Sequence, residues 1–200
     1  MGFHCADLFE AVVDRVPERI ALVCDDDRLS FLQLEQEANR VADFLRQRGL
    51  QAGDRVGIHG ENSARWVIAM IAALKLRCVP ININYRYESE ELRYLLDNAG
   101  VVALFSQASF LPRVQAVRDR LPALRQLLRL DPGEAPAWAD SSVDEALKRG
   151  APERRFETRS EEDHFVVYTG GTTGMPRGVV WTHRDVIFAL GGGTDPFSGE

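Results

Sequence analysis

The sequence has little of what marks secreted, membrane-spanning or metal-binding proteins. Its opening residues contain no basic segment followed by a long apolar stretch, and no later segment approaches roughly 18 uninterrupted apolar residues. The three cysteines lie far apart without a C-x-x-C pair, and the four histidines form no i, i+4 pair. We therefore expect a cytoplasmic protein with reduced thiols, no transmembrane segment and no metal site formed by these residues.

Basic stripes are also absent from the chain. The formal net charge is -6 and the arginines are interspersed with acids, so the electrostatic footprint of a nucleic-acid-binding protein is missing. With 45% hydrophobic and 27% charged residues over 200 positions, the composition is that of a soluble globular protein with a sizeable core. The composition does not indicate an oligomeric state.

The first 130 residues alternate between helical and strand patterns. Ser30 and Gln33 form a predicted capping box at the start of a helix that ends at Gly49. Further helices are predicted at 63–76, 89–100 and 110–121, and strands at 54–60, 78–83, 101–106 and 126–130. Such alternation implies right-handed crossovers that build a parallel sheet flanked by helices. The predicted fold class is therefore α/β.

The composition changes over residues 131–160, which are rich in proline and charge. One short helix, capped by Ser142 and Glu145, interrupts what we expect to be an exposed connection. The charged run at 154–163 is typical of a solvated face. We expect its last acids, at 161–163, to face solvent rather than to bind magnesium.

The segment YTGGTTGMPRGVVWTH, at 168–183, is the most informative part of the chain. Apolar runs at 164–169 and 178–183 predict two strands joined by this loop. The loop combines backbone N–H groups without an adjacent Cβ, short hydroxyls and one permanent cation, which together suit a polyphosphate. These candidate ligand-binding residues are Thr169, Gly170, Gly171, Thr172, Thr173, Gly174 and Arg177.

Two better-known phosphate motifs do not account for the loop. Gly174 is followed by Met175 and Pro176 instead of the Lys and Ser/Thr of a Walker A motif, and no G-x-G-x-x-G opens a dinucleotide-binding unit. Residue types alone leave an ordinary glycine-rich hairpin as the alternative.

The loop closely resembles the signature phosphate-binding loop of the adenylate-forming superfamily, written Tyr/Phe-Thr-Ser-Gly-Ser/Thr-Thr-Gly-x-Pro-Lys-Gly-Val. Two positions depart from it: Gly170 replaces a common Ser, and Arg177 replaces the usual Lys. Both replacements keep the capacity to bind phosphate, although a planar guanidinium places its donors differently from an ammonium. The segments at 29–58 and 67–105 also resemble the family, and VPININYRYESEELRYLL, at 79–96, is similar to the acyl-CoA synthetases that act on fatty or steroid side-chain acids.

The resemblance implies a two-step ligase. A carboxylic acid would attack the α-phosphate of Mg²⁺-bound ATP, pyrophosphate would leave, and the thiol of coenzyme A would capture the acyl-adenylate. The loop would stabilise the charge on the departing pyrophosphate. Small-molecule carboxylic acids are thus the implied substrates, with ATP, Mg²⁺ and coenzyme A as the implied cofactors and co-substrates.

The family places its adenine, magnesium and acyl pockets and its catalytic lysine downstream of this loop. We therefore expect residues 1–200 to be the N-terminal portion of an AMP-binding domain, truncated and inactive alone, with no catalytic residue assigned within it. Two alternatives stay open. One is a non-catalytic nucleotide-binding fragment, and the other is an adenylation domain that serves a carrier protein.

Overall fold

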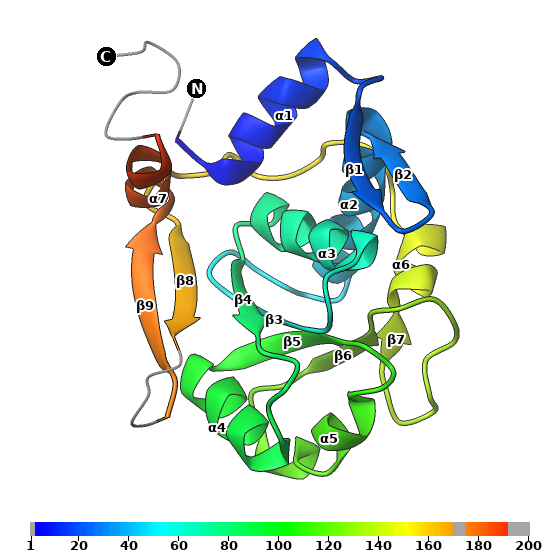
Figure 1. Ribbon diagram of the computed structural model, residues 1–200, viewed down its shortest axis with the longest axis vertical. Coiled ribbons are helices and arrows are strands. Elements are labelled where there is room, and N and C mark those ends of the chain that lie inside the picture. The colour runs from blue at the N-terminus through cyan, green and yellow to red at the C-terminus, as the bar shows by residue number, and fades with distance from the viewer. Residues whose placement is uncertain (1–2, 170–174, 192–200) are drawn as a thin grey trace.

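The computed structural model describes residues 3–169 and 175–191 of the chain (Figure 1). Its helices are α1 (Cys5–Arg15), α2 (Phe31–Gln47), α3 (Ala64–Lys75), α4 (Ser89–Ala99), α5 (Leu111–Gln115), α6 (Val143–Arg149) and α7 (His183–Leu190), with a 3₁₀ turn η1 (Arg118–Arg120). Its strands are β1 (Ile20–Cys24), β2 (Asp27–Ser30), β3 (Arg55–His59), β4 (Val79–Ile83), β5 (Val101–Ser106), β6 (Gln126–Arg129), β7 (Ser141–Ser142), β8 (His164–Thr169) and β9 (Arg177–Thr182).

The centre of the structure is a parallel sheet with the strand order β4-β3-β5-β6-β7. Helices cover both faces: α2, α3 and α6 lie over one, and α4 and α5 over the other (Figure 1). After β3, the chain adds β4 on one side of it and then returns to add β5 on the other side, so the order of strand addition reverses at β3. The predicted α/β class and the parallel sheet are confirmed.

Two hydrophobic clusters form because neighbouring strand residues point to opposite faces. On β6, Leu128 belongs to the cluster under α2 and α3, whereas Leu127 belongs to the cluster under α4. Phe105 and Leu104 divide in the same way on β5. A strand that is buried on both faces has a nearly continuous apolar sequence, and VVALFS of β5 is an example.

The predicted helix ends follow their local signals. Ser30 accepts from the backbone N–H of Gln33 while the Gln33 side chain accepts from the N–H of Ser30, so the capping box of α2 is confirmed. Gly100 ends α4 in the left-handed conformation, at φ 62°. Sequence patterns did not reveal α1 or the β1–β2 hairpin, whose residues pack as a cap over α2 and α3 (Figure 1).

The prediction of a single helix at 110–121 is wrong. The structure contains the short α5 followed by η1, separated near Ala116. Val117, at φ -122° and ψ -5°, leaves the helical conformation between the two, and Pro122 disfavours helical backbone at Leu121, where η1 ends at φ -120° and ψ 72°. Val117 and Leu121 are both buried in the cluster under α4.

Residues 131–160 are less exposed than expected. The stretch contributes β7 to the sheet and the predicted α6, whose Val143 and Ala146 are fully buried. The prediction that 154–163 is a solvated run is wrong for Arg159 and Asp163, whose side chains are 7% and 14% exposed. Arg154 is exposed as predicted, but all three side chains form ion pairs with residues of α1, α2 and the turn after α3.

Gly150 lies where the chain after α6 crosses α2. A Cβ at this position would lie 1.9 Å from the Arg40 carbonyl oxygen, which is too close for any side chain. We expect Gly150→Ala to lower the free energy of unfolding by about 3 kcal/mol, the upper end of the range for overpacking, because the two backbones must move apart. Urea denaturation measures the change. Gly100→Ala is the control, since its cost of about 1 kcal/mol would come from backbone conformation alone; equal losses would contradict the steric explanation.

Candidate functional site

The Gly/Thr-rich segment lies on an antiparallel hairpin, β8–β9, as predicted. Thr169 and Arg177 are the last register pair of this hairpin, so the hydroxyl and the guanidinium belong to the same end. Both residues are exposed. Among the residues that the structure describes, no acidic side chain lies within ion-pair distance of Arg177, which leaves its charge available for an anion. The predicted site residues Gly170, Gly171, Thr172, Thr173 and Gly174 lie outside the described residues.

Tyr168 connects this end of the hairpin to the sheet. Its hydroxyl donates to Asn98 Oδ1 at 2.8 Å, and its ring packs on the cluster under α4. Burial is the main reason that the pKa of Tyr168 is raised, so the phenol stays protonated and remains a donor. The residue immediately before Thr169 is therefore held by both packing and a hydrogen bond.

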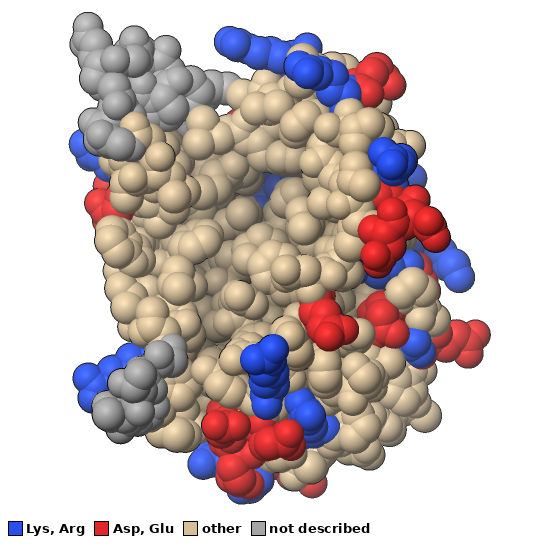
Figure 2. Space-filling view, in the orientation of Figure 1, with Lys and Arg blue, Asp and Glu red and all other residues tan. Residues whose placement is uncertain are grey.

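An uncharged groove runs between β8 and β4. Two adjoining cavities of about 310 and 260 Å³ form this β4–β8 groove and share Asn82 and Tyr168. The remaining lining is aromatic, apolar or amide: Gly60, Asn62, Trp66, Met70, Pro80, Ile83, Asn84, Tyr85, Tyr87, Leu95, Phe165, Val166 and Val167. Figure 2 shows this hollowed face between the hairpin and α3, with charged side chains gathered around its rim. Trp66 and Met70, which are partly buried against the cluster under α2 and α3, also line this groove.

The opposite end of the hairpin is fixed by a buried polar cluster. Asp163, directly before β8, accepts two hydrogen bonds from Arg77 at 2.8 Å each. Burial alone would raise the pKa of Asp163, but the hydrogen bonds from Arg77 and the Ser160 N–H outweigh it and lower the pKa. The expectation that Asp163 faces solvent is wrong, because its side chain is only 14% exposed.

Two histidines complete this cluster. His4 and His183 are fully buried, and their rings stack with centroids 3.8 Å apart. Burial is the largest cause that lowers the pKa of His4 to about 3 and that of His183 to about 4. Neither residue stood out in the sequence, because no pattern links position 4 to position 183.

A second buried network ties α1, α2 and α3 to the segment before β8. Lys75, fully buried, lies 2.5 Å from Glu10 and 3.0 Å from Glu35. Arg154 contacts Glu35 with two nitrogens, and Arg159 contacts Glu10 in the same way. Burial would raise the pKa of Glu10, but hydrogen bonds from Arg159 and Lys75 lower it. The segment that leads into β8 is thus held by charge pairs on its N-terminal side.

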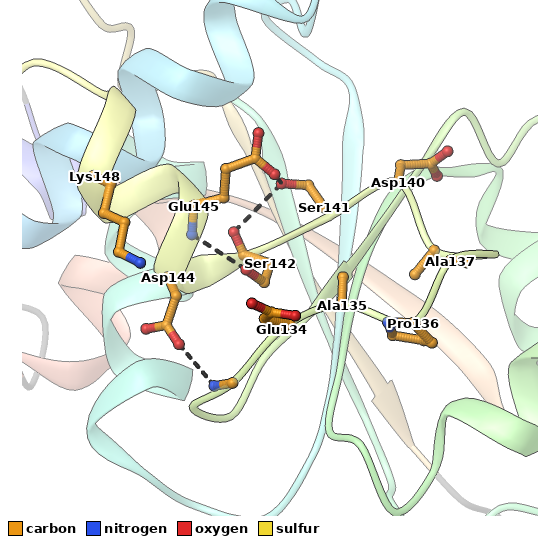
Figure 3. Close-up of a pocket in the computed structure, with 12 residues that line it drawn as sticks. Glu134, Ala135, Pro136, Ala137, Asp140, Ser141, Ser142, Asp144, Glu145 and Lys148 are labelled. Carbon is orange, nitrogen blue, oxygen red and sulfur yellow. Dashed lines mark hydrogen bonds between the residues drawn. The ribbon is translucent and has the colours of Figure 1, made fainter.

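The pocket between the 133–142 loop and α6 lies at the far edge of the sheet from the hairpin (Figures 1 and 3). Two hydrogen bonds join polar groups of this pocket to one another. Asp144 accepts from the Gly133 N–H, and Ser141 donates to Glu145. These pairs stabilise the loop, so we assign no ligand to this pocket.

Within residues 3–169 and 175–191, no helix is long and apolar enough to cross a membrane. The same ranges contain no group of three or more His, Cys, Asp or Glu side chains arranged to hold a metal ion.

Comparisons with known proteins agree with the family resemblance of the loop sequence. The chain is 42% identical to a 3-oxocholest-4-en-26-oate–CoA ligase of Rhodococcus rhodochrous, and 39% identical to a medium/long-chain-fatty-acid–CoA/3-oxocholest-4-en-26-oate–CoA ligase of Mycobacterium tuberculosis. Each alignment covers 100% of this chain and 37% of the relative. The chain therefore spans little more than a third of the length of these curated relatives.

A solved structure shares the fold. The crystal structure of an anthranilate CoA ligase in complex with anthranoyl-AMP superposes with a TM-score of 0.86 at 26% identity, over 94% of this chain and 36% of that one. The model of the family described as AMP-binding enzyme matches residues 9–197, which include the sheet, the β8–β9 hairpin and the loop between its strands. This chain belongs to the AMP-binding enzyme family.

Proposed function

We propose that the protein to which this chain belongs activates a carboxylic acid with ATP and transfers the acyl group to coenzyme A. A carboxylate oxygen attacks the α-phosphorus of ATP as the bond to pyrophosphate breaks. The thiol sulfur of coenzyme A then attacks the acyl carbon, and AMP leaves with the bonding electron pair. The names of the relatives support fatty acids or steroid side-chain acids as the substrate class.

One observation carries the proposal: the family's phosphate-loop sequence connects two strands whose ends bring Thr169 and Arg177 together. A hydroxyl donor and a guanidinium that has no acidic partner among the described residues suit phosphate oxygens, and fixed donors stabilise charge as it develops on a leaving group. We assign phosphate binding to Thr169 and Arg177, together with Gly170, Gly171, Thr172, Thr173 and Gly174. Mg²⁺ belongs to the proposal as a counter-ion of the nucleotide phosphates, with no ligand assigned to it here.

The proposal includes the position of the chain within the enzyme and in the cell. We assign residues 1–200 to the N-terminal portion of the AMP-binding domain, because the whole chain aligns with 37% of its relatives. The three free cysteines favour the reducing cytoplasm. The chain alone is expected to form no acyl-CoA from ATP, coenzyme A and a fatty or steroid acid, and detection of that product would contradict this assignment.

Arg177→Gln tests the phosphate site directly. We expect the 200-residue protein to bind pyrophosphate and Mg-ATP, and the substitution to weaken both by about 10- to 100-fold, because a charge-assisted hydrogen bond is lost. Isothermal titration calorimetry measures the dissociation constants. Arg184→Gln is the matched control, since Arg184 is also exposed but lies at the opposite end of the hairpin. Equal affinities of wild type and Arg177→Gln would overturn the assignment of Arg177.

A non-catalytic nucleotide-binding role is the second candidate. The departures of the loop from the family pattern, Gly170 for Ser and Arg177 for Lys, are the observation that favours it. Binding of ATP without release of pyrophosphate, in a protein extended to the length of its relatives, would support this role over the ligase.

A further inference from the structure

The β8–β9 hairpin is attached to the rest of the structure unevenly. Its inner side packs against β4 and against the cluster under α4, through Val166 and Tyr168. Its outer side is open: Val179 is 41% and Val180 61% exposed. An isolated two-stranded sheet is marginally stable, so contacts at its base strongly influence where the hairpin lies.

The base of the hairpin is held through His183. Its backbone N–H donates to the Asp163 carbonyl at 3.0 Å, and its ring Nδ1 accepts from the backbone N–H of Cys5 at 3.3 Å. The His4 ring lies against it, and His4 Nδ1 accepts from the Ala6 N–H at 3.1 Å. One imidazole pair therefore joins the N-terminus of α1 to the junction between β9 and α7, two elements about 180 residues apart in the chain.

The hydrogen bonds determine the tautomer of both rings. Because each Nδ1 accepts an N–H, the single proton of each neutral imidazole lies on Nε2. A second proton would have to bind at Nδ1, where it would face a backbone donor and remove a cap of α1. The charged groups around the pair are the carboxylates of Asp163 and Asp7 and the guanidinium groups of Arg77 and Arg159. Both rings stay neutral at pH 7 in these surroundings.

Arg77 shows that this cluster is maintained at a conformational cost. The residue has φ 59°, in the left-handed region that favours glycine, at the C-terminal end of α3. Glycine there would relieve the backbone but would remove both hydrogen bonds to Asp163. A strained non-glycine residue persists where its side chain is needed.

We propose that His4 and His183, supported by the Arg77–Asp163 pair, are positioning residues for the hairpin end that carries Thr169 and Arg177. Through the paired register of β8 and β9, the imidazole stack sets where that end lies relative to the β4–β8 groove. The relevance of this position to phosphate binding rests on the proposed function. The positioning of the hairpin end itself rests on the geometry alone.

A metal site is the obvious competing assignment for two histidines beside a carboxylate. The geometry opposes it, since the two ring planes are 28° apart and stacked, so that their in-plane lone pairs do not converge on one point. Both Nδ1 atoms already accept hydrogen bonds. His4 Nε2 is 3.8 Å from Asp163, and this contact carries no charge on the neutral ring.

Substitution of His183 by two amides provides the test. In His183→Asn, the side-chain amide oxygen would occupy the place of Nδ1 and keep the bond from Cys5, whereas the longer side chain in His183→Gln extends toward the place of Nε2 and loses it. Amide hydrogen exchange, measured in the 200-residue protein at Cys5, His183 and Val180, should accelerate about tenfold in His183→Gln and much less in His183→Asn, because one buried hydrogen bond is lost. Nitrogen NMR of the rings should show Nε2 protonation of His4 and His183 at pH 7.

The control is Val143→Ala, in α6, which destabilises the core far from the hairpin. If Val143→Ala and His183→Gln accelerate exchange at these three amides equally, the histidines act only on global stability and the proposal fails. Weaker pyrophosphate binding in His183→Gln than in Val143→Ala would confirm the link to the site. If wild type binds neither pyrophosphate nor ATP, the proposed function fails for this chain, while the exchange data still decide the positioning role.

Discussion

Lys75→Ala is expected to lower the free energy of unfolding by about 3 kcal/mol, near the lower end of the range for breaking a buried ion pair. The substitution leaves Glu10 and Glu35 without the ammonium between them. The loss stays at the lower end because Arg159 and Arg154 still contact the two glutamates. Urea denaturation at pH 7 measures the change.

The chain offers a matched control for this substitution. Lys75 and Lys148 are its only lysines, and Lys148 is exposed on α6. Lys148→Ala should change stability by less than about 0.5 kcal/mol. Similar effects of the two substitutions would show that the buried network does not stabilise the packing of α1, α2 and α3.

Acidification from pH 7 to pH 5 is expected to destabilise the protein steeply. His4, His59 and His183 are buried, and burial is the main cause that lowers their pKa from 6.5 to about 3, 4 and 4. Below pH 6.5 the unfolded chain binds protons that the folded chain does not bind, so the free energy of unfolding falls as the pH falls. Each histidine contributes about 1.4 kcal/mol per pH unit, and the three together up to about 4 kcal/mol per unit.

Urea titrations at closely spaced pH values between 7.5 and 5 test this slope. His183→Asn should reduce the slope by about one third at the pH values where it folds, since one of three titrating groups is removed. Val143→Ala, which removes no titrating group, should leave the slope unchanged. Stability that is independent of pH over this interval would contradict the burial of the neutral rings.

Local signals in the sequence were sufficient wherever neighbouring residues determine the structure. The Ser30 and Gln33 box, the Gly100 stop and the two strands around the Gly/Thr-rich loop all appear as predicted. Residues 110–121 show the limit of periodicity, because the apolar spacing predicts one helix whereas the backbone of Val117, at φ -122° and ψ -5°, leaves the helical conformation between α5 and η1.

The sequence by itself determined the α/β class, the hairpin and the candidate phosphate loop, because capping, periodicity and glycine placement act within a few residues. Only the tertiary structure decided that Arg159 and Asp163 are partners in buried networks rather than part of a solvated run, and that His4 stacks on His183. These contacts depend on which distant segments the folded chain brings together. Burial then decides whether a charge is solvated or must find a partner, and no local pattern of residues encodes that depth.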